Sequence, residues 1–157
     1  MTGATVGDMI DKMQEYEHLL NNIYSDLRGR SSRDVVRLLT YRLAREHNHV
    51  ARFLKNYPAE QIAALRSVRL RHPDTEFLPE RCFEDEYLAA QIKPTELLDS
   101  AIRIFDILAC FSRWLANEPV DPKAQKLLSE LAKAEEEEIM NLTKLKAENG
   151  FRTGKRS

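Results

Sequence analysis

The sequence predicts an all-α protein, a four-helix bundle made of two antiparallel hairpins that a long crossover joins. Apolar residues recur at helical spacing in four segments, and no segment alternates between apolar and polar residues as a strand does. The chain has 157 residues, 43% of them hydrophobic, so it can bury one sizeable core but is short for two. A single domain over residues 1–157 is therefore expected.

The first hairpin is predicted to join a helix over residues 8–27 to a second helix that ends near Tyr57. The stretch RGRSS breaks the pattern between them, and Ser31 or Ser32 can cap the second helix. Pro58 marks its end. The residues expected to face inward are Met9, Met13, Tyr16, Leu20, Ile23, Tyr24 and Leu27 on the first helix, and Val35, Leu39, Leu43, Val50, Phe53 and Leu54 on the second.

The second hairpin is predicted from helices over residues 95–116 and 123–148, joined by the turn NEPVDP. In that turn Asp121 can cap the last helix while Pro122 takes its first position. Residues 149–157 are polar and basic and are expected to form a flexible tail. The inward residues are Ala101, Ile104, Phe105, Leu108, Phe111 and Leu115, then Leu127, Leu128, Leu131, Ile139, Leu142 and Leu145.

The connection from Pro58 to Pro94 is far longer than the turns within the two hairpins. Prolines and charges divide it into short pieces, although AEQIAALRSVRL can continue as a helix. A connection of this length lets the second hairpin pack with crossover topology. This is the ferritin-like form of the four-helix bundle, distinct from a simple up-down-up-down arrangement.

The charge balance and the cysteines exclude several classes of protein. Lysine and arginine together number 24 against 25 acidic residues, which argues against a nucleic-acid or anionic-membrane partner. No apolar run approaches membrane-spanning length, and the N-terminus lacks a signal pattern. Cys82 and Cys110 lie far apart, so a reduced, cytoplasmic protein without a four-cysteine metal site is expected.

Carboxylates fall on the inward stripes of three predicted helices. Glu17 lies on the first helix, Glu46 near the middle of the second stripe with His49 at its edge, and Glu135 with Glu138 on the last helix. Residues three apart share a helix face, so each of the two pairs can offer two ligands to one site. Ionised carboxylates in a core are costly and repel one another, and a bound cation removes both penalties. Carboxylates with an imidazole suit iron, manganese or zinc.

Other interpretations of these residues remain open. An isolated ExxH arises by chance in a chain rich in glutamate, and the run AKAEEEE is typical of a solvated charged face. Glu17 can pair with a lysine or arginine across the bundle. The metal hypothesis rests on the three helices taken together, because their carboxylates all coincide with core stripes.

The three segments resemble the rubrerythrin branch of the ferritin-like superfamily, without its rubredoxin domain. EHLLNNIY, which begins at Glu17, resembles the family's Glu followed seven residues later by Tyr. LAREHNHVARFL is similar to the family's ExxH helix, and LSELAKAEEEEIMNL to its LAxxExxE/H segment. The resemblance covers all four helices but not the crossover.

By this resemblance, Glu17 is a terminal ligand to one metal, and Glu46 and Glu135 bridge two metals. His49 ligates or stands beside the first metal, and Glu138 ligates the second. The resemblance implies a di-iron oxidoreductase that reduces peroxide or oxidises ferrous iron with O₂.

The helix over residues 95–116 departs from the family pattern. Phe105 stands at the ligand position, Ser112 stands where Tyr is common, and Asp106 is rotated out of the site. Three outcomes follow: an asymmetric di-metal centre with water in place of the missing ligand, a single ion held through Glu17, Glu46, His49 and Glu135, or a relic without metal. The competing function is a helical interaction or structural protein with a degenerate metal site.

The same helix is apolar nearly all round, since Ile102, Ile107, Ala109, Cys110 and Trp114 lie outside its inward stripe. Such a helix is doubly buried or forms an interface, so a homodimer through this face, or its cover by the crossover, is expected. Cys110 is interpreted as a small buried apolar residue.

Overall fold

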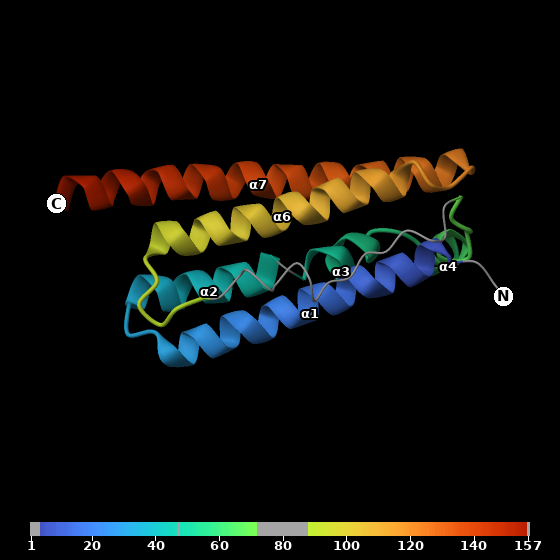
Figure 1. The fold of residues 1–157 in the computed structure, drawn as a ribbon. Helices are drawn as coiled ribbons and strands as arrows, with labels where there is room; N and C mark the ends of the chain where they lie inside the picture. The colour runs from blue at the N-terminus through green and yellow to red at the C-terminus, as the bar shows by residue number, and fades with distance from the viewer. Residues whose placement is uncertain (1–3, 47, 72–87, 157) are drawn as a thin grey trace.

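The computed structural model describes residues 4–46, 48–71 and 88–156, with side chains described as far as Glu148. These residues form six helices and no strand, which confirms the all-α class for the part of the chain described (Figure 1). The one element of β pairing in them is an isolated bridge between Thr5 and Arg69. None of the described helices is both long enough and apolar enough to cross a membrane.

The first hairpin consists of α1 (Val6–Arg30) and α2 (Asp34–Glu46), which pack along each other. A capping box starts α1, in which the Thr5 hydroxyl accepts from the Asp8 amide and the Asp8 carboxylate from the Thr5 amide. At the opposite end of α1, the Ser31 amide donates to the Leu27 carbonyl. The turn to α2 is therefore short, as predicted.

The prediction of one continuous second helix that ends near Tyr57 is wrong, because the structure divides this segment into two helices. After Glu46 the chain makes a turn at Asn48, and a separate short helix, α3 (His49–Leu54), follows. A further helix, α4 (Ala59–Arg66), begins after Pro58 and lies against the N-terminal end of α1. The break after Glu46 leaves the first amides of α3 without helical carbonyl partners.

The second hairpin consists of α6 (Pro94–Ala116) and α7 (Pro122–Arg156), which pack along each other. Its turn matches the prediction, because the Lys123 amide donates to the Asp121 side chain and α7 begins at Pro122. The helix α7 continues to Arg156, beyond the predicted helix end at Glu148 and through the segment expected to be a flexible tail.

The chain leaves the first hairpin at one end of the bundle and enters the second hairpin at the opposite end. The Leu70 amide donates to the Ala4 carbonyl at the N-terminal end of α1, whereas Arg30 at its other end donates to the Leu88 carbonyl. As a result α2 and α6 run in the same direction (Figure 1). The central part of the predicted crossover, residues 72–87 with His72 and Cys82, lies outside the described residues.

Most predicted core residues are buried, and they form one apolar cluster shared by the two hairpins. Two predictions about individual residues are wrong. Val35 is 48% exposed, and its neighbour Val36 faces the core instead. Cys110 is exposed, because α6 buries its neighbours Ala109 and Phe111 instead.

Candidate functional site

Glu17 of α1 is buried in the bundle and binds the start of α3. Its carboxylate accepts from the His49 amide at 2.8 Å and from the Val50 amide at 3.2 Å. These are the amides that the break after Glu46 leaves free, and a helix N-terminus favours a negative charge. The predicted ligand Glu17 therefore acts, in this structure, as an acceptor that holds α3 in place.

Burial dominates the ionisation of Glu17, whose side chain is only 3% exposed. Desolvation raises its pKa to about 8, although the amides of His49 and Val50, and the charge of Arg52, act in the opposite direction. At neutral pH this carboxyl is thus largely protonated.

Glu135 of α7 lies equally deep, at 1% exposure. The Ser112 hydroxyl of α6 donates to it, at 2.9 and 3.1 Å from its two oxygens. Burial raises the pKa of Glu135 to about 8; the bond from Ser112 lowers it, and the charge of Glu17 raises it further. Glu17 and Glu135 are therefore close enough to repel each other when both are ionised, and we call them the inner pair.

Glu46 of α2 and Glu138 of α7 form a second pair nearer the surface, which we call the outer pair. Burial raises the pKa of Glu138, and so do the charge of Glu46 and a hydrogen bond between the two carboxyls. Cations accompany this pair: Arg52 lies 3.4 Å from Glu46, and the charge of Arg42 acts on Glu138. The outer pair is consequently compensated by arginines that the sequence interpretation did not include.

His49 stands between the two pairs at the first position of α3. Burial lowers the pKa of its imidazole below the ordinary 6.5, and the charge of Arg52 acts in the same direction. The ring is therefore neutral at pH 7, which is the state that ligates metals. Its Nε2 atom is buried and has no hydrogen-bond partner among the described residues.

A surface groove of about 420 Å³ opens over the outer pair, between α3 and α7. Glu46, His49, Arg52 and Glu138 all line it. The groove gives solvent and solutes access to the outer pair, whereas Glu17 and Glu135 lie beneath it in the core and are not part of its lining.

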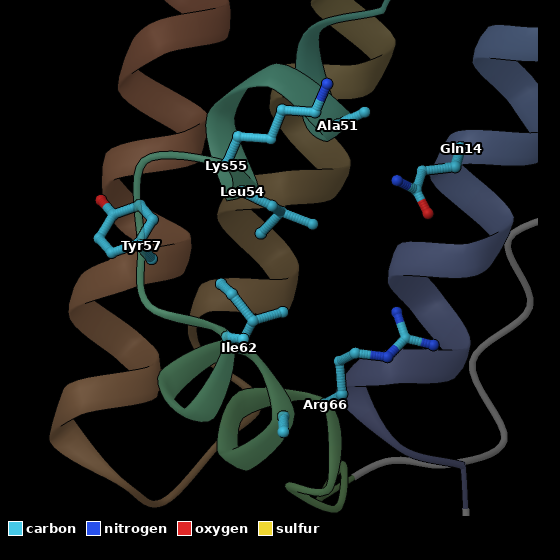
Figure 2. A pocket seen from close by; sticks show the side chains of 9 residues that line it. Gln14, Ala51, Leu54, Lys55, Tyr57, Ile62 and Arg66 are labelled. Atoms are coloured by element: carbon cyan, nitrogen blue, oxygen red, sulfur yellow. The ribbon is translucent and has the colours of Figure 1, made fainter.

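A second, larger hollow of about 540 Å³ lies between α1 and the segment that contains α3 and α4. Figure 2 shows Leu54 and Ile62 pointing into it, with Gln14 on the facing side of α1. None of the five predicted ligands lines this hollow. It is mainly apolar and plays no part in the candidate site.

The carboxylates and the imidazole of the five predicted ligands suit a divalent cation, but these side chains lie too far apart in the structure to bind one ion together. Among the described residues, no three side chains of His, Cys, Asp or Glu lie close enough together to hold a metal ion. The structure instead brings the five residues together as two carboxyl pairs with one neutral imidazole between them. Every one of them comes from α1, from α7 or from either side of the α2–α3 break.

The predicted inward position of Phe105 and outward position of Asp106 on α6 are confirmed. Phe105 is fully buried in the core, and Asp106 is exposed on the opposite side of the helix. Ser112 is fully buried and bonded to Glu135. The helix α6 thus contributes a hydroxyl to the inner pair, and no carboxylate of α6 is buried beside it.

Comparison of the chain with models of known families, with curated proteins and with solved structures gave no match.

Proposed function

We propose that this chain is a metal-binding helical bundle of the ferritin-like type, whose ligands are Glu17, Glu46, His49, Glu135 and Glu138. The observation that supports the proposal most strongly is the inner pair, two carboxyl groups from separate helices that are at most 3% exposed and lie within electrostatic range of each other. The order and direction of the helices, with α2 and α6 parallel, support the ferritin-like topology (Figure 1).

Burying two carboxyls lowers the stability of the metal-free protein unless they are neutralised. Apolar residues of similar volume in their place would often be as stable or more so. A divalent cation that replaces the protons of the inner pair turns this cost into binding free energy. His49 adds a neutral nitrogen donor whose Nε2 has no other partner among the described residues.

Iron is the first candidate for this ion, and manganese and zinc suit the same carboxylate and imidazole ligands. An iron ion bound here would supply one-electron exchange with peroxide or O₂. The residues of the chain would bind the ion and screen it from water, while the groove above Glu46 and Glu138 would admit a small oxidant.

A second candidate function is a helical interaction or structural protein that has lost its metal. Specific observations favour it as well. Glu17 and Glu135 have hydrogen-bond donors within the chain, and Phe105 fills the core where a fourth carboxylate is expected. A homodimer through α6 remains a prediction under either function.

Calorimetric titration of the metal-stripped protein with Fe(II) under anaerobic conditions, and with Mn(II) and Zn(II), separates the two functions. Measured at pH 7 in two buffers of different ionisation enthalpy, it yields both the stoichiometry and the number of protons displaced. We expect saturable binding with release of about one to two protons per ion, because the inner pair is protonated in the free protein.

The matched variants are Glu135→Gln, which removes one buried ligand, and Glu148→Gln, which changes an exposed residue of the same helix. We expect the first to weaken binding at least about tenfold and the second to leave it unchanged. Absence of saturable binding by all three ions, with equal thermal stability in EDTA and in excess metal, would overturn the metal-binding function.

A further inference from the structure

The outer face of α2 carries a line of exposed apolar side chains. Val35, Leu38 and Tyr41 are 48%, 68% and 60% exposed, and they follow one another at three-residue spacing. The broad apolar face of the same helix is buried in the core through Val36 and Leu43. An exposed apolar line on a helix whose core face is already satisfied marks an interaction surface.

The line is one residue wide, which restricts what can cover it. A narrow stripe of apolar residues at successive turns is the seam that one helix presents to another, whereas the face that lies on a membrane is much broader. Arg37 lies beside Leu38 in such a seam and Arg45 lies one helical turn beyond Tyr41, and both arginines are exposed. Flanking charges of this kind select the partner helix.

Positive charge dominates around the seam, although the chain as a whole has a net charge of −1. Residues 28–45 contain six arginines and a single acidic residue, Asp34. Among the described residues no ion pair involves Arg37 or Arg45, and both are exposed. The guanidinium of Arg28 lies 3.5 Å from the centre of the Tyr41 ring and donates to the Thr40 hydroxyl, so the ring is already oriented.

We propose that the outer face of α2 is a docking surface for an acidic amphipathic helix of another protein. Leu38 and Tyr41 enter the apolar seam of that helix, and Arg37 and Arg45 pair with glutamates or aspartates that border the seam. Tyrosine and arginine are the residue types that dominate binding at protein interfaces. This surface is separate from the candidate metal ligands, so the proposal does not depend on the proposed function.

A second copy of the chain is a poorer occupant of this face. Two α2 helices packed seam to seam would bring Arg37 and Arg45 of both copies together, and like charges across an interface oppose association. A nucleic acid would match the arginines but would leave Leu38 and Val35 without an apolar partner.

The test uses the full chain and a labelled, monomeric helical peptide with leucine at heptad positions a and d and glutamate at e and g. A control peptide carries lysine at e and g. Fluorescence anisotropy should show saturable binding of the acidic peptide only. Leu38→Glu should weaken this binding at least about tenfold, whereas Met140→Glu, at an apolar residue of α7 that is 59% exposed, should not change it.

Reversing the charge of Arg37 and Arg45 tests the contribution of these two arginines separately from that of the apolar seam. The double variant Arg37→Glu and Arg45→Glu should no longer bind the acidic peptide and should bind the lysine peptide instead. Binding of the acidic peptide that Leu38→Glu does not affect would overturn the proposal, and so would failure of the acidic peptide to bind. Two further outcomes would overturn it: Leu38-dependent self-association in sedimentation, and Leu38-dependent binding to vesicles of phosphatidylcholine and phosphatidylglycerol.

Discussion

The inner pair, Glu17 and Glu135, and the outer pair, Glu46 and Glu138, contain the same residue type but hold their charges in different ways. The inner carboxyls are at most 3% exposed, are hydrogen-bonded to amides or to a hydroxyl, and have pKa values near 8. The outer carboxyls border a groove and lie beside arginines. Burial without a cation keeps the inner carboxyls protonated, whereas neighbouring arginines compensate the outer carboxyls.

Of the two pairs, the inner one depends on a ligand for its neutralisation at high pH. The outer pair is compensated by the chain itself, through Arg52 and Arg42. The inner pair has donors but no ion pair of its own among the described residues, so it is neutral only while it is protonated. A bound cation would therefore change the protonation of the inner pair more than that of the outer pair.

The largest predicted effect of the inner pair is a loss of stability of the metal-free protein as pH rises. Glu17 and Glu135 have pKa values of about 8 in the folded chain against 4.5 ordinarily, so the folded state binds more protons than the unfolded state between these values. Stability therefore falls as pH rises through this window. The lowered pKa of His49 opposes this trend only below its ordinary 6.5.

Between pH 6.5 and 8 we expect the free energy of unfolding to fall by roughly 2–4 kcal/mol, at about 1.4 kcal/mol per carboxyl and pH unit. Urea unfolding in the presence of EDTA measures this change. Glu135→Gln should remove about half of the pH dependence, and a stability that stays flat or rises over this range would contradict the protonation of the inner pair.

The next effect is on α3, which Glu17 holds by its first two amides. Glu17→Ala should lower the free energy of unfolding by about 1–3 kcal/mol, because the amides of His49 and Val50 lose their acceptor. Hydrogen exchange at these two amides should accelerate. Glu17→Gln keeps an acceptor oxygen, so it should protect both amides better than the alanine; equal exchange in the two variants would argue against the contact.

A smaller effect is expected at Ser112, the residue of α6 that donates to the inner pair. Ser112→Ala should lower stability at pH 8 by about 1 kcal/mol, because the ionised Glu135 loses its hydrogen-bond donor. At pH 5.5, where Glu135 is protonated, the loss should be smaller. Unfolding curves at the two pH values test this, and an equal loss at both would indicate a packing effect only.

The smallest effect belongs to the outer pair. Arg52→Gln should change the free energy of unfolding by less than about 1 kcal/mol, because its ion pair with Glu46 is 3.4 Å long and its own side chain is 44% exposed. Urea unfolding in low and in high salt measures the difference. A loss of stability as large as that of Glu17→Ala would mean that the outer pair contributes as much to the free energy of unfolding as the inner pair.

Much of the fold could be predicted from helical periodicity. Pro122 and Asp121 fixed the start of the last helix, and Phe105 was correctly placed in the core of α6. The break after Glu46 could not be predicted, because LAREHNHVARFL contains neither glycine nor proline and keeps its apolar spacing. The break depends on a tertiary contact, the burial of Glu17 against the amides of α3.

The candidate site was predicted in its residue types more than in its geometry. Helical periodicity predicts Glu17 and Glu135 on core stripes, and both are buried. The same periodicity does not predict that Arg52 folds back onto Glu46, since a long side chain can reach beyond the helix face on which it begins. It also chose Val35 over Val36, two neighbouring residues of one type that only the packing of α2 distinguishes.

The central claim is that the inner pair holds protons at neutral pH and exchanges them for a divalent cation. Carbon-13 NMR of glutamate side-chain carboxyls, titrated from pH 4 to 9 with and without Zn(II), tests it most directly. Without metal, the signals of Glu17 and Glu135, assigned by their Gln variants, should titrate near pH 8. With Zn(II) these transitions should move at least about two pH units lower. Titration of both carboxyls near pH 4.5 without metal, or transitions that Zn(II) does not move, would contradict the account.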